Sequence, residues 1–443
     1  MFFPVFEMPW LGDRWLIGSM AILHVLINHA AAIGGSLMLV ALEHRGRKLG
    51  DERWDVLAYR LAFVYFVLVT TVGALTGVGI WFTTMVAEPA GIGTMLRIFF
   101  WGWFAEWLVF VLEVVMVMAY FLSWKVMRPQ THLKLGYAYA ISSAATMAII
   151  TGILSSMLTP GHWLIHHGFW DGFLNPSYPP QLLLRSGLAL GLGAGLSMLL
   201  SRWLAPEDLR AEASRFLARF LLASVPLAAI GGAWYLAVLP DQVRDLIPTA
   251  LMTTQFAPYV QDSYLANGLI AVAVLAVGFW ALKRHKPLPT AAVFVPFLAL
   301  VMLLGQFERV REFVRKPYLI PGYLYANGIR VDAVPELNKT GVLAQAPYAA
   351  VHTVTPANRL LAGREVYRLE CAECHTIGGL NDLRAKTAGK SPEAIDGFVA
   401  HLHDIHPFMP PFVGTDAERQ ALAAYLSSLS TPVAKTTERA HGG

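Results

Sequence analysis

Long apolar stretches separated by short polar links make up the first 312 residues of the chain. A helix needs about 20 apolar residues to cross the hydrocarbon core of a bilayer. Eight stretches reach that length, approximately over residues 15–42, 58–84, 95–124, 133–158, 181–204, 216–239, 264–283 and 289–312. The pattern therefore predicts eight transmembrane helices, and the fold class is all-α, a polytopic membrane helix bundle.

The pattern changes after the eighth stretch. Residues 317–356 are rich in Pro, Gly, Tyr and Asn without a long periodic run, which is typical of extended chain, here expected on the outer face. From about residue 357 the composition is that of a small soluble domain, with helices predicted over residues 359–370 and 416–429. We expect a transmembrane domain over 1–316, an extended linker over 317–356 and a small helical domain over 357–443.

Composition supports this division and excludes several classes of protein. Of the 443 residues, 56% are hydrophobic and only 14% are charged, which is too apolar for a water-soluble enzyme. The net charge of +4 is modest, and nothing in the sequence suggests nucleic-acid binding. The first residues lack a basic segment followed by a small-residue cleavage site. We therefore expect no removable signal peptide, and a first apolar helix that stays among membrane lipids.

Lysine and arginine gather in alternate links between the apolar stretches. The basic links contain Arg45, Arg47, Lys48 and Arg53, then Lys125, Arg128 and Lys134, then Arg202, Arg210 and Arg215, and finally Lys283, Arg284 and Lys286. The other links, around Glu88 and over residues 162–180 and 240–262, contain few basic residues. The positive-inside rule places the basic links in the cytoplasm and both chain ends outside. We expect a multi-pass protein of the bacterial inner membrane, with its C-terminal domain on the periplasmic side.

The two cysteines of the chain stand in the run Cys371-Ala-Glu-Cys374-His375. C-x-x-C-H is the haem-attachment pentapeptide, in which the thiols bond to the haem vinyl groups and the histidine takes the iron. No other cysteine is present, so no disulfide framework competes with this interpretation. Haem is attached in this way outside the bacterial cytoplasm, in agreement with the charge pattern. The sequence predicts one covalent haem c.

A c-type haem needs a second axial ligand, and a thioether is usual when the carrier works at a positive potential. Met409 lies in a proline-rich run, 35 residues after Cys374. His401, His403 and His406 lie nearby and are the competing ligands. Roughly the last 75 residues resemble the class I cytochrome c family, and the resemblance rests on Cys371, Cys374, His375, Met409 and the closing helix.

Four ionisable residues inside or at the end of the predicted spans are candidate functional residues, because such groups are costly in hydrocarbon. His24 lies about 15 Å below the outer surface at 1.5 Å per residue, and Glu106 lies at a similar depth. Glu113 is two helical turns beyond Glu106, and Glu312 ends the eighth span. A buried histidine can ligate haem iron, and carboxylates near it can ligate or carry protons. For each residue alone, the alternative is a satisfied polar contact between helices.

Other residues in the spans and loops have two interpretations. His29 is five residues after His24 and on another side of the helix, so it is either a packing residue or a ligand of a second haem. The outer-loop histidines ligate a further haem, shape a docking surface or form an interfacial polar loop; they are His162, His166 and His167. Glycines at four-residue spacing favour close helix packing; they are Gly73 and Gly77, and Gly187, Gly191 and Gly195.

Four segments resemble subunit I of the cytochrome bd quinol oxidase family: residues 14–24, 74–77, 106–113 and 312–318. The resemblance covers roughly residues 10–325 and is strongest in the first four spans. It implies that His24 ligates the oxygen-reactive d haem and that Glu106 and Glu113 serve that haem and its proton supply. It also implies that Glu312, just before Arg315, ligates a high-spin b haem, and that a second membrane subunit is present. The spacing of the two third-span glutamates is one residue shorter than in the family, which leaves the role of Glu106 open.

The sequence also departs from that family. The family holds a low-spin b haem with a histidine on the fifth span and a methionine on the seventh. The corresponding residues 182–187 and 264–268 contain neither. The long loop that handles quinol and a ninth span are missing. The simplest account is that the quinol route has been lost and that the c haem serves as the outer electron port.

Three functions follow from these observations. The leading hypothesis is an electron-transfer module between the c haem and one or two haems of b or d type near His24 and Glu312, with oxygen reduction left open. The second is a non-catalytic relay and membrane-anchor subunit, which exchanges electrons with a periplasmic donor or acceptor protein or with the quinone pool. The third is a transporter-like bundle with an appended carrier domain. In the first, Glu106, Glu113 and Arg315 are the catalytic candidates.

Overall fold

A computed structural model describes residues 3–4, 6–252 and 259–429. Nearly all of its regular structure is helical, which confirms the predicted all-α class. The chain divides into two compact units. The bundle unit consists of residues 18–83 and 92–315, and the C-terminal unit consists of residues 1–17, 84–91 and 316–443.

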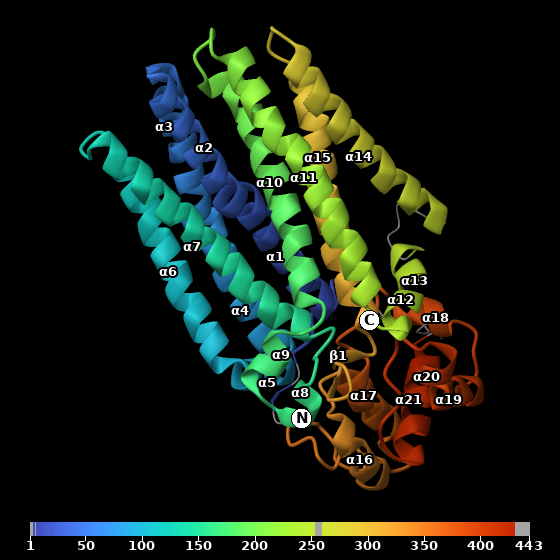
Figure 1. Ribbon diagram of the computed structural model, residues 1–443. Helices are drawn as coiled ribbons and strands as arrows, with labels where there is room; N and C mark the ends of the chain where they lie inside the picture. The colour runs from blue at the N-terminus through green and yellow to red at the C-terminus, as the bar shows by residue number, and fades with distance from the viewer. Residues whose placement is uncertain (1–2, 5, 253–258, 430–443) are drawn as a thin grey trace, which may run out of the picture. The chain divides into compact units, whose positions relative to one another are not determined.

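Eight helical segments of the described chain are long and apolar enough to cross a membrane, so the predicted number of spans is confirmed. Most of them run side by side in the bundle unit (Figure 1). The first two are continuous runs in which a π-helical turn separates two α-helices: α1 Asp13–Ile27, η1 Asn28–Ile33 and α2 Gly34–Leu49, then α3 Glu52–Leu68, η2 Val69–Gly73 and α4 Ala74–Ala87. The others are α6 Phe100–Leu122, α7 Pro129–Ser156, α10 Tyr178–Leu204, α11 Arg210–Val238, α14 Val260–Lys283 and α15 Thr290–Val314.

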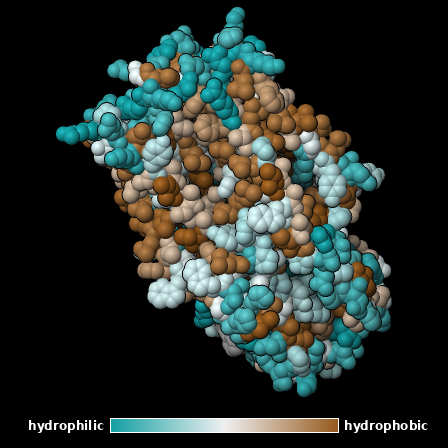
Figure 2. All heavy atoms as spheres, viewed as in Figure 1, coloured by the Kyte–Doolittle hydropathy of each residue, from teal (hydrophilic) through white to brown (hydrophobic). Residues whose placement is uncertain are grey.

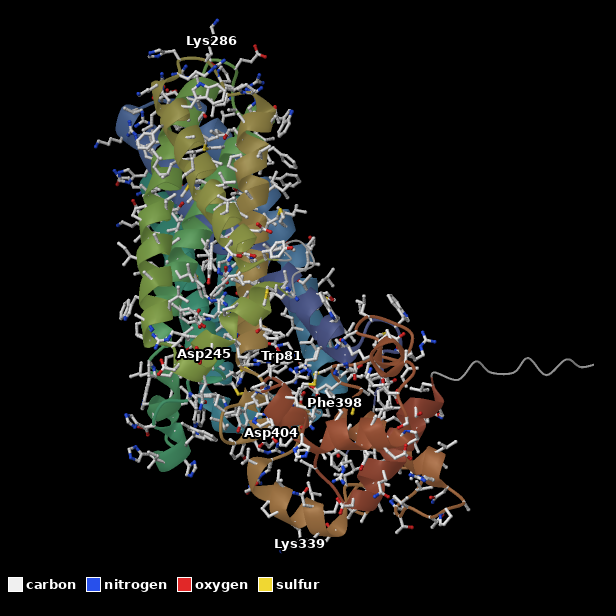
Figure 3. The ribbon with its side chains drawn as sticks, turned by 90° about the vertical axis from the view of Figure 1, so that its right-hand side faces the viewer. Trp81, Asp245, Lys286, Lys339, Phe398 and Asp404 are labelled. Atoms are coloured by element: carbon white, nitrogen blue, oxygen red, sulfur yellow. The ribbon has the colours of Figure 1, made fainter. Side chains whose placement is uncertain are left out.

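The surface of the long helices is mainly apolar, and hydrophilic side chains gather at their upper end in this view (Figure 2). Short helices fill several links: α5 Pro89–Ile98, α8 Trp163–His166, α9 Phe169–Phe173, α12 Asp241–Asp245 and α13 Ile247–Met252. Lys286, between α14 and α15, and Asp245, at the end of α12, lie at opposite ends of the bundle (Figure 3). The bundle therefore separates this basic link from the link poor in lysine and arginine, as the predicted alternation requires.

Small residues let the central helices approach closely. A Cβ atom on Gly193 of α10 would lie 2.3 Å from the backbone of Gly34, and one on Gly187 would lie 2.5 Å from the backbone nitrogen of Ala228 on α11. Side chains cannot be added at such contacts without moving a helix. The prediction that the glycines of the fifth span serve close helix packing therefore agrees with the structure. The helix α10 lies at the centre of the bundle, between α2 and α11.

The C-terminal unit contains the only strands of the described chain, an antiparallel pair of β1 Tyr318–Ile320 and β2 Leu324–Tyr325. Its helices are η3 Val331–Ala333, α16 Val334–Thr340, α17 Arg359–Glu370, α18 Leu383–Thr387, α19 Pro392–Ala400, α20 Leu402–Ile405 and α21 Asp416–Ser428. The bounds of α17 are as predicted, and those of α21 agree to within one residue.

The segment expected to be an extended linker, residues 317–356, has a folded path. Isolated apolar residues along it, Ile329, Leu337, Val342 and Leu343, are buried in one core with residues of α17 and α21. Single apolar residues that do not recur with a helical or strand period do not predict a buried segment from the sequence pattern. This core extends the small domain toward the N-terminus beyond the composition change at residue 357.

Glu418 joins this segment to α21. Thr415 and Glu418 form a capping box at the start of the helix, and the Glu418 carboxylate also accepts hydrogen bonds from the backbone N–H groups of Val342 at 3.2 Å and Leu343 at 2.8 Å. Gly341 and Gly414 approach the same carboxylate with positive φ angles of 89° and 140°. A single buried side chain therefore satisfies donors from two distant segments.

Replacing Glu418 with Ala is expected to destabilise the C-terminal unit by about 3 kcal/mol or more, because each buried N–H left unpaired costs about 1–3 kcal/mol. Glu418→Gln keeps a carbonyl acceptor and should lose less than half as much. Thermal unfolding of the full-length protein, followed through the c-haem absorbance, measures both. Equal melting temperatures for the wild type and Glu418→Ala would contradict the proposed role.

Candidate haem-binding sites

The pentapeptide Cys371 to His375 forms a tight turn directly after α17. The backbone N–H groups of Cys374 and His375 both donate to the Cys371 carbonyl oxygen, at 3.2 and 2.9 Å. Tyr367 donates its hydroxyl to the His375 carbonyl oxygen at 2.9 Å, and Asn381 donates its amide to the Cys374 carbonyl oxygen at 2.7 Å. Both cysteines are free thiols. The turn thus presents two thiols and an imidazole from one fixed backbone.

The His375 ring has the hydrogen-bonding arrangement of a metal ligand. Its Nδ1 atom lies 3.3 Å from the Asn381 carbonyl oxygen, which can only accept, so Nδ1 carries the proton. The Nε2 lone pair is then available for iron. Burial lowers the pKa of His375 to about 4, which keeps the imidazole neutral, as coordination requires. These residues fit a covalent haem.

Met409 lies in the loop between α20 and α21. The Met409 N–H donates to the His406 carbonyl oxygen at 2.8 Å. The ring Nδ1 of His403 lies 2.8 Å from the Met409 carbonyl oxygen. His403 therefore holds the backbone of the methionine loop. His401 is exposed next to Asp404, and the ring of His406 packs between Phe398 and Phe408. Ligation by Met409 stays a prediction, and the structure gives one of its competitors, His403, another role.

The segment at residues 7–14 lies against the haem-attachment loop, within the C-terminal unit. Leu380 N–H donates to the Trp10 carbonyl oxygen at 2.8 Å, and Arg14 N–H donates to the Glu373 carbonyl oxygen at 3.2 Å. Glu7 forms an ion pair with Arg368 of α17. The sequence analysis missed this contact, because the two partners are more than 350 residues apart in the chain and neither has a motif that points to the other.

Arg14 is the central side chain of that contact. Its guanidinium lies 2.5 Å from the Glu373 carboxylate and 3.3 Å from that of Glu88, and it also donates to the Ala326 carbonyl oxygen. Burial raises the pKa of Glu373 well above its usual value, Arg14 opposes that rise and the nearby Glu88 adds to it. One partly buried cation therefore connects the start of α1, the end of the second span, the turn after β2 and the pentapeptide.

His24 in the bundle unit shows the same arrangement as His375. Its Nδ1 lies 3.1 Å from both the Gly73 carbonyl oxygen and the Thr76 hydroxyl, so Nδ1 carries the proton. Its Nε2 accepts from the Asn28 amide at 2.7 Å. A Cβ on Gly77 would lie 3.0 Å from the ring, so the glycine gives the imidazole its space. A neutral imidazole with its lone pair on Nε2 fits a haem-iron ligand.

The other predicted residues of the bundle lie on α6 and at the end of α15. Glu113 of α6 is buried and accepts a hydrogen bond from Ser143 of α7 at 2.6 Å, whereas Glu106, two turns earlier, is half-buried. Glu312 near the end of α15 forms an ion pair with Arg315 at 2.5 Å. The structure thus brings Glu312 and Arg315 together, while Glu113 contacts α7 and His24 contacts α4.

A buried ionic cluster in the same unit was missed by the sequence analysis, apart from His29. Arg185 of α10 lies 2.5 Å from Glu308 of α15, Arg311 lies 3.2 Å from the same carboxylate, and His29 of η1 lies 3.5 Å from Arg185. An arginine inside an apolar stretch is itself a signal of function.

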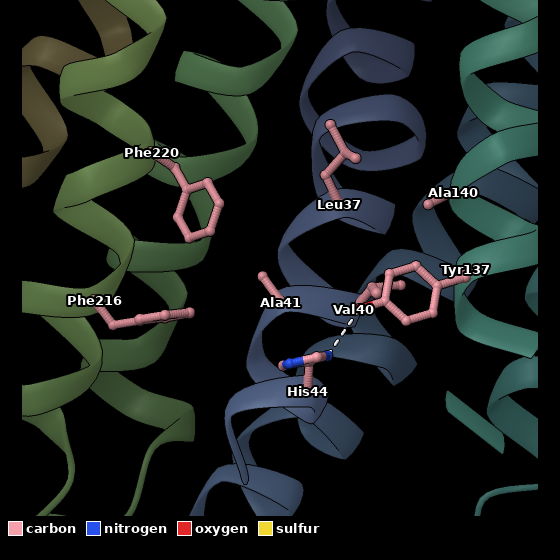
Figure 4. Close-up of a pocket in the computed structure, with 8 residues that line it drawn as sticks. All are labelled: Leu37, Val40, Ala41, His44, Tyr137, Ala140, Phe216 and Phe220. Atoms are coloured by element: carbon pink, nitrogen blue, oxygen red, sulfur yellow. Dashed lines mark hydrogen bonds between the residues drawn. The ribbon is translucent and has the colours of Figure 1, made fainter. Parts of the chain in front are cut away.

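Two other features of the bundle unit are a loop with three histidines and a pocket. The outer-loop histidines, His162, His166 and His167, are exposed, and the rings of His162 and His166 stack at 5.9 Å, as in an interfacial polar loop. A pocket of about 310 Å³ opens between α2, α7 and α11 (Figure 4). Its walls are apolar or aromatic except for the hydrogen-bonded pair of His44 and Tyr137 at 2.8 Å.

A haem-attachment turn in a small helical domain and a bundle of eight apolar helices define a membrane protein with a cytochrome c domain. Residues 358–426 match the family described as cytochrome C oxidase, cbb3-type, subunit III. This match confirms the predicted cytochrome c domain, which implies a covalent haem c.

The fold of most of the chain also has a counterpart among solved structures. The bd oxidase from Geobacillus thermodenitrificans matches with a TM-score of 0.55 and 16% sequence identity, over 71% of this chain and 90% of that one. At this identity the likeness shows the fold alone, and it confirms the bd-oxidase-like helical architecture predicted from the sequence. A search of curated proteins finds no match.

Proposed function

We propose that this membrane haem protein transfers electrons between the haem c of Cys371, Cys374 and His375 and one or two non-covalent haems in the bundle, near His24 and Glu312. The observation that carries the proposal is the shared arrangement of His24 and His375. Each ring directs Nδ1–H at a backbone carbonyl oxygen, which puts a lone pair on Nε2. In His24 this lone pair accepts a hydrogen bond from the Asn28 amide, which iron coordination would replace. Two such histidines, one in a membrane span and one in a cytochrome c domain, are what an electron path through two haems needs.

The remaining residues have supporting roles in this proposal. Haem iron supplies a one-electron carrier at each site. Arg315 holds the Glu312 carboxylate in place, and Gly77 leaves room for the His24 ring. Glu113, fixed by Ser143, and Glu106 two turns away can hold or pass a proton along α6. The bd-oxidase-like fold supports haems of b or d type and a terminal oxidase in the respiratory chain of the bacterial inner membrane.

Topology and partners belong to the same proposal. The alternation of basic links supports a periplasmic position for the cytochrome c domain and both chain ends. A soluble electron donor or acceptor then reaches the c haem from the periplasm. The exposed aromatic residues of α6, Phe100, Trp101, Phe104 and Trp107, support contact with lipid and with a second membrane subunit.

An optical spectrum of the purified protein, with a count of haem by type, tests the proposal. We expect one haem c per chain together with non-covalent haem. A long-wavelength chlorin band that moves on addition of carbon monoxide would identify an oxygen-reactive haem d and favour the oxidase. Six-coordinate b and c signals alone would favour the relay and membrane-anchor subunit. A protein whose only haem is covalent would overturn the proposal.

A further inference from the structure

The charges of the buried cluster on α10 and α15 do not balance. Two guanidinium groups, of Arg185 and Arg311, contact the single carboxylate of Glu308, which leaves one positive charge among these three groups. Arg185 is 3% exposed and Glu308 is 7% exposed, so water outside the bundle does not reach them. An uncompensated charge is costly inside a membrane protein, and an anion at this point would remove the cost.

His29 does not supply or remove charge in the cluster. Its Nδ1 lies 2.9 Å from the Val25 carbonyl oxygen and therefore carries a proton. Its Nε2 faces Arg185 at 3.5 Å, and a second ring proton there would point at a cation. The imidazole is therefore neutral, and the net positive charge of the cluster stands.

Polar atoms without hydrogen-bond partners surround the same charge. Gln181 is fully buried, and neither its amide nitrogen nor its amide oxygen has a partner. It lies one helical turn before Arg185 on α10, on the same face. Arg185 Nε and the hydroxyl of Tyr235 on α11 also have none, and Tyr235 interacts electrostatically with Arg185 and Glu308. Buried donors without partners are rare in native proteins, which indicates that a bound group satisfies them.

We propose that Arg185 and Gln181 bind an anionic carboxylate inside the bundle, and that this carboxylate is a propionate of the haem ligated by His24. The N–H donors of a guanidinium and an amide match the planar geometry of a carboxylate. One propionate removes the net charge of the cluster. His29 connects the two sites, because it follows His24 on the same helical run and interacts electrostatically with both His24 and Arg185. This inference rests on the function proposed above.

The test removes the Arg185 guanidinium together with the Glu308 carboxylate that it contacts. In the double variant Arg185→Gln/Glu308→Gln the net charge of the cluster is unchanged, but the guanidinium donors are lost. We expect this variant to lose most of its non-covalent haem relative to haem c, measured by pyridine haemochrome spectra. Gln181→Leu should lose a smaller part, and Arg185→Lys, which keeps a cationic donor, should retain most of it.

A matched control separates the binding role from a structural one. Arg45→Gln/Glu212→Gln removes an ion pair of 2.7 Å between α2 and α11 of the same unit and should keep its full haem content. A density map of the wild type provides the second measurement. Porphyrin density that continues to Arg185 supports the proposal, and an isolated small anion beside Arg185, with the porphyrin elsewhere, overturns it.

Failure of this inference can be told apart from failure of the proposed function. Wild-type protein with no non-covalent haem would overturn both. Wild-type protein with non-covalent haem, all of which is retained in Arg185→Gln/Glu308→Gln, would overturn the carboxylate site alone.

Discussion

Replacing His24 with Ala is expected to remove a non-covalent haem from the bundle while leaving the covalent haem c at full stoichiometry. The substitution deletes the Nε2 lone pair that the hydrogen bonds of Nδ1 to Gly73 and Thr76 prepare for iron. Because the change lies in a membrane span, the attachment turn at Cys371 should still mature. The ratio of non-covalent to covalent haem, determined from pyridine haemochrome spectra, measures the effect.

His44→Ala is the matched control for this prediction. His44 lies on α2 of the same unit, lines the pocket next to Tyr137 and has no proposed cofactor role. It should leave both haem contents unchanged. Non-covalent haem at the wild-type level in His24→Ala would show that another residue carries the ligation.

Replacing Met409 with Ala is expected to lower the midpoint potential of haem c by an amount on the order of a few tenths of a volt, since axial ligands set haem potentials over about 0.8 V. A thioether ligand favours ferrous iron, and its loss exposes the iron to water or to a histidine, which favours the ferric state. A redox titration of haem c absorbance in the purified protein measures the shift.

The neighbouring histidines serve as comparisons for Met409. His401→Ala should leave the potential unchanged, because the His401 side chain is 70% exposed and lies next to Asp404. His403→Ala should change the potential less than Met409→Ala, because His403 contacts only the carbonyl oxygen of the methionine. An unchanged potential in Met409→Ala, with a large change in one of the histidine variants, would reassign the ligand.

The sequence predicts the long helices well, because their signals are local. Twenty apolar residues can satisfy their backbone in lipid only as a helix, so span number follows from length and hydropathy. The helix α17 and the motif after it were equally clear from amphipathic spacing and from Cys371, Cys374 and His375. The cytochrome c domain and the bd-oxidase-like fold were therefore both predictable.

The contacts of the candidate site were less predictable, because they depend on geometry that local patterns do not contain. The π-helical turn η1 changes the direction of every side chain around His29. The residue types of Asn28–Ile33 do not predict a π-helical turn. Arg185 and Glu308 are 123 positions apart in the chain and meet only when α10 and α15 pack. The sequence spacing predicts that Gly77 serves helix packing, whereas in the structure Gly77 lies against the ring of His24.

The contact between residues 7–14 and the haem-attachment loop has a consequence for how the protein matures. Trp10 and Arg14 pair with backbone that belongs to the final eighty or so residues of the chain. These hydrogen bonds can form only after residues 373–380 have been synthesised, long after residues 7–14. Haem attached before this contact forms would be attached to a loop that still lacks part of its hydrogen-bonded support.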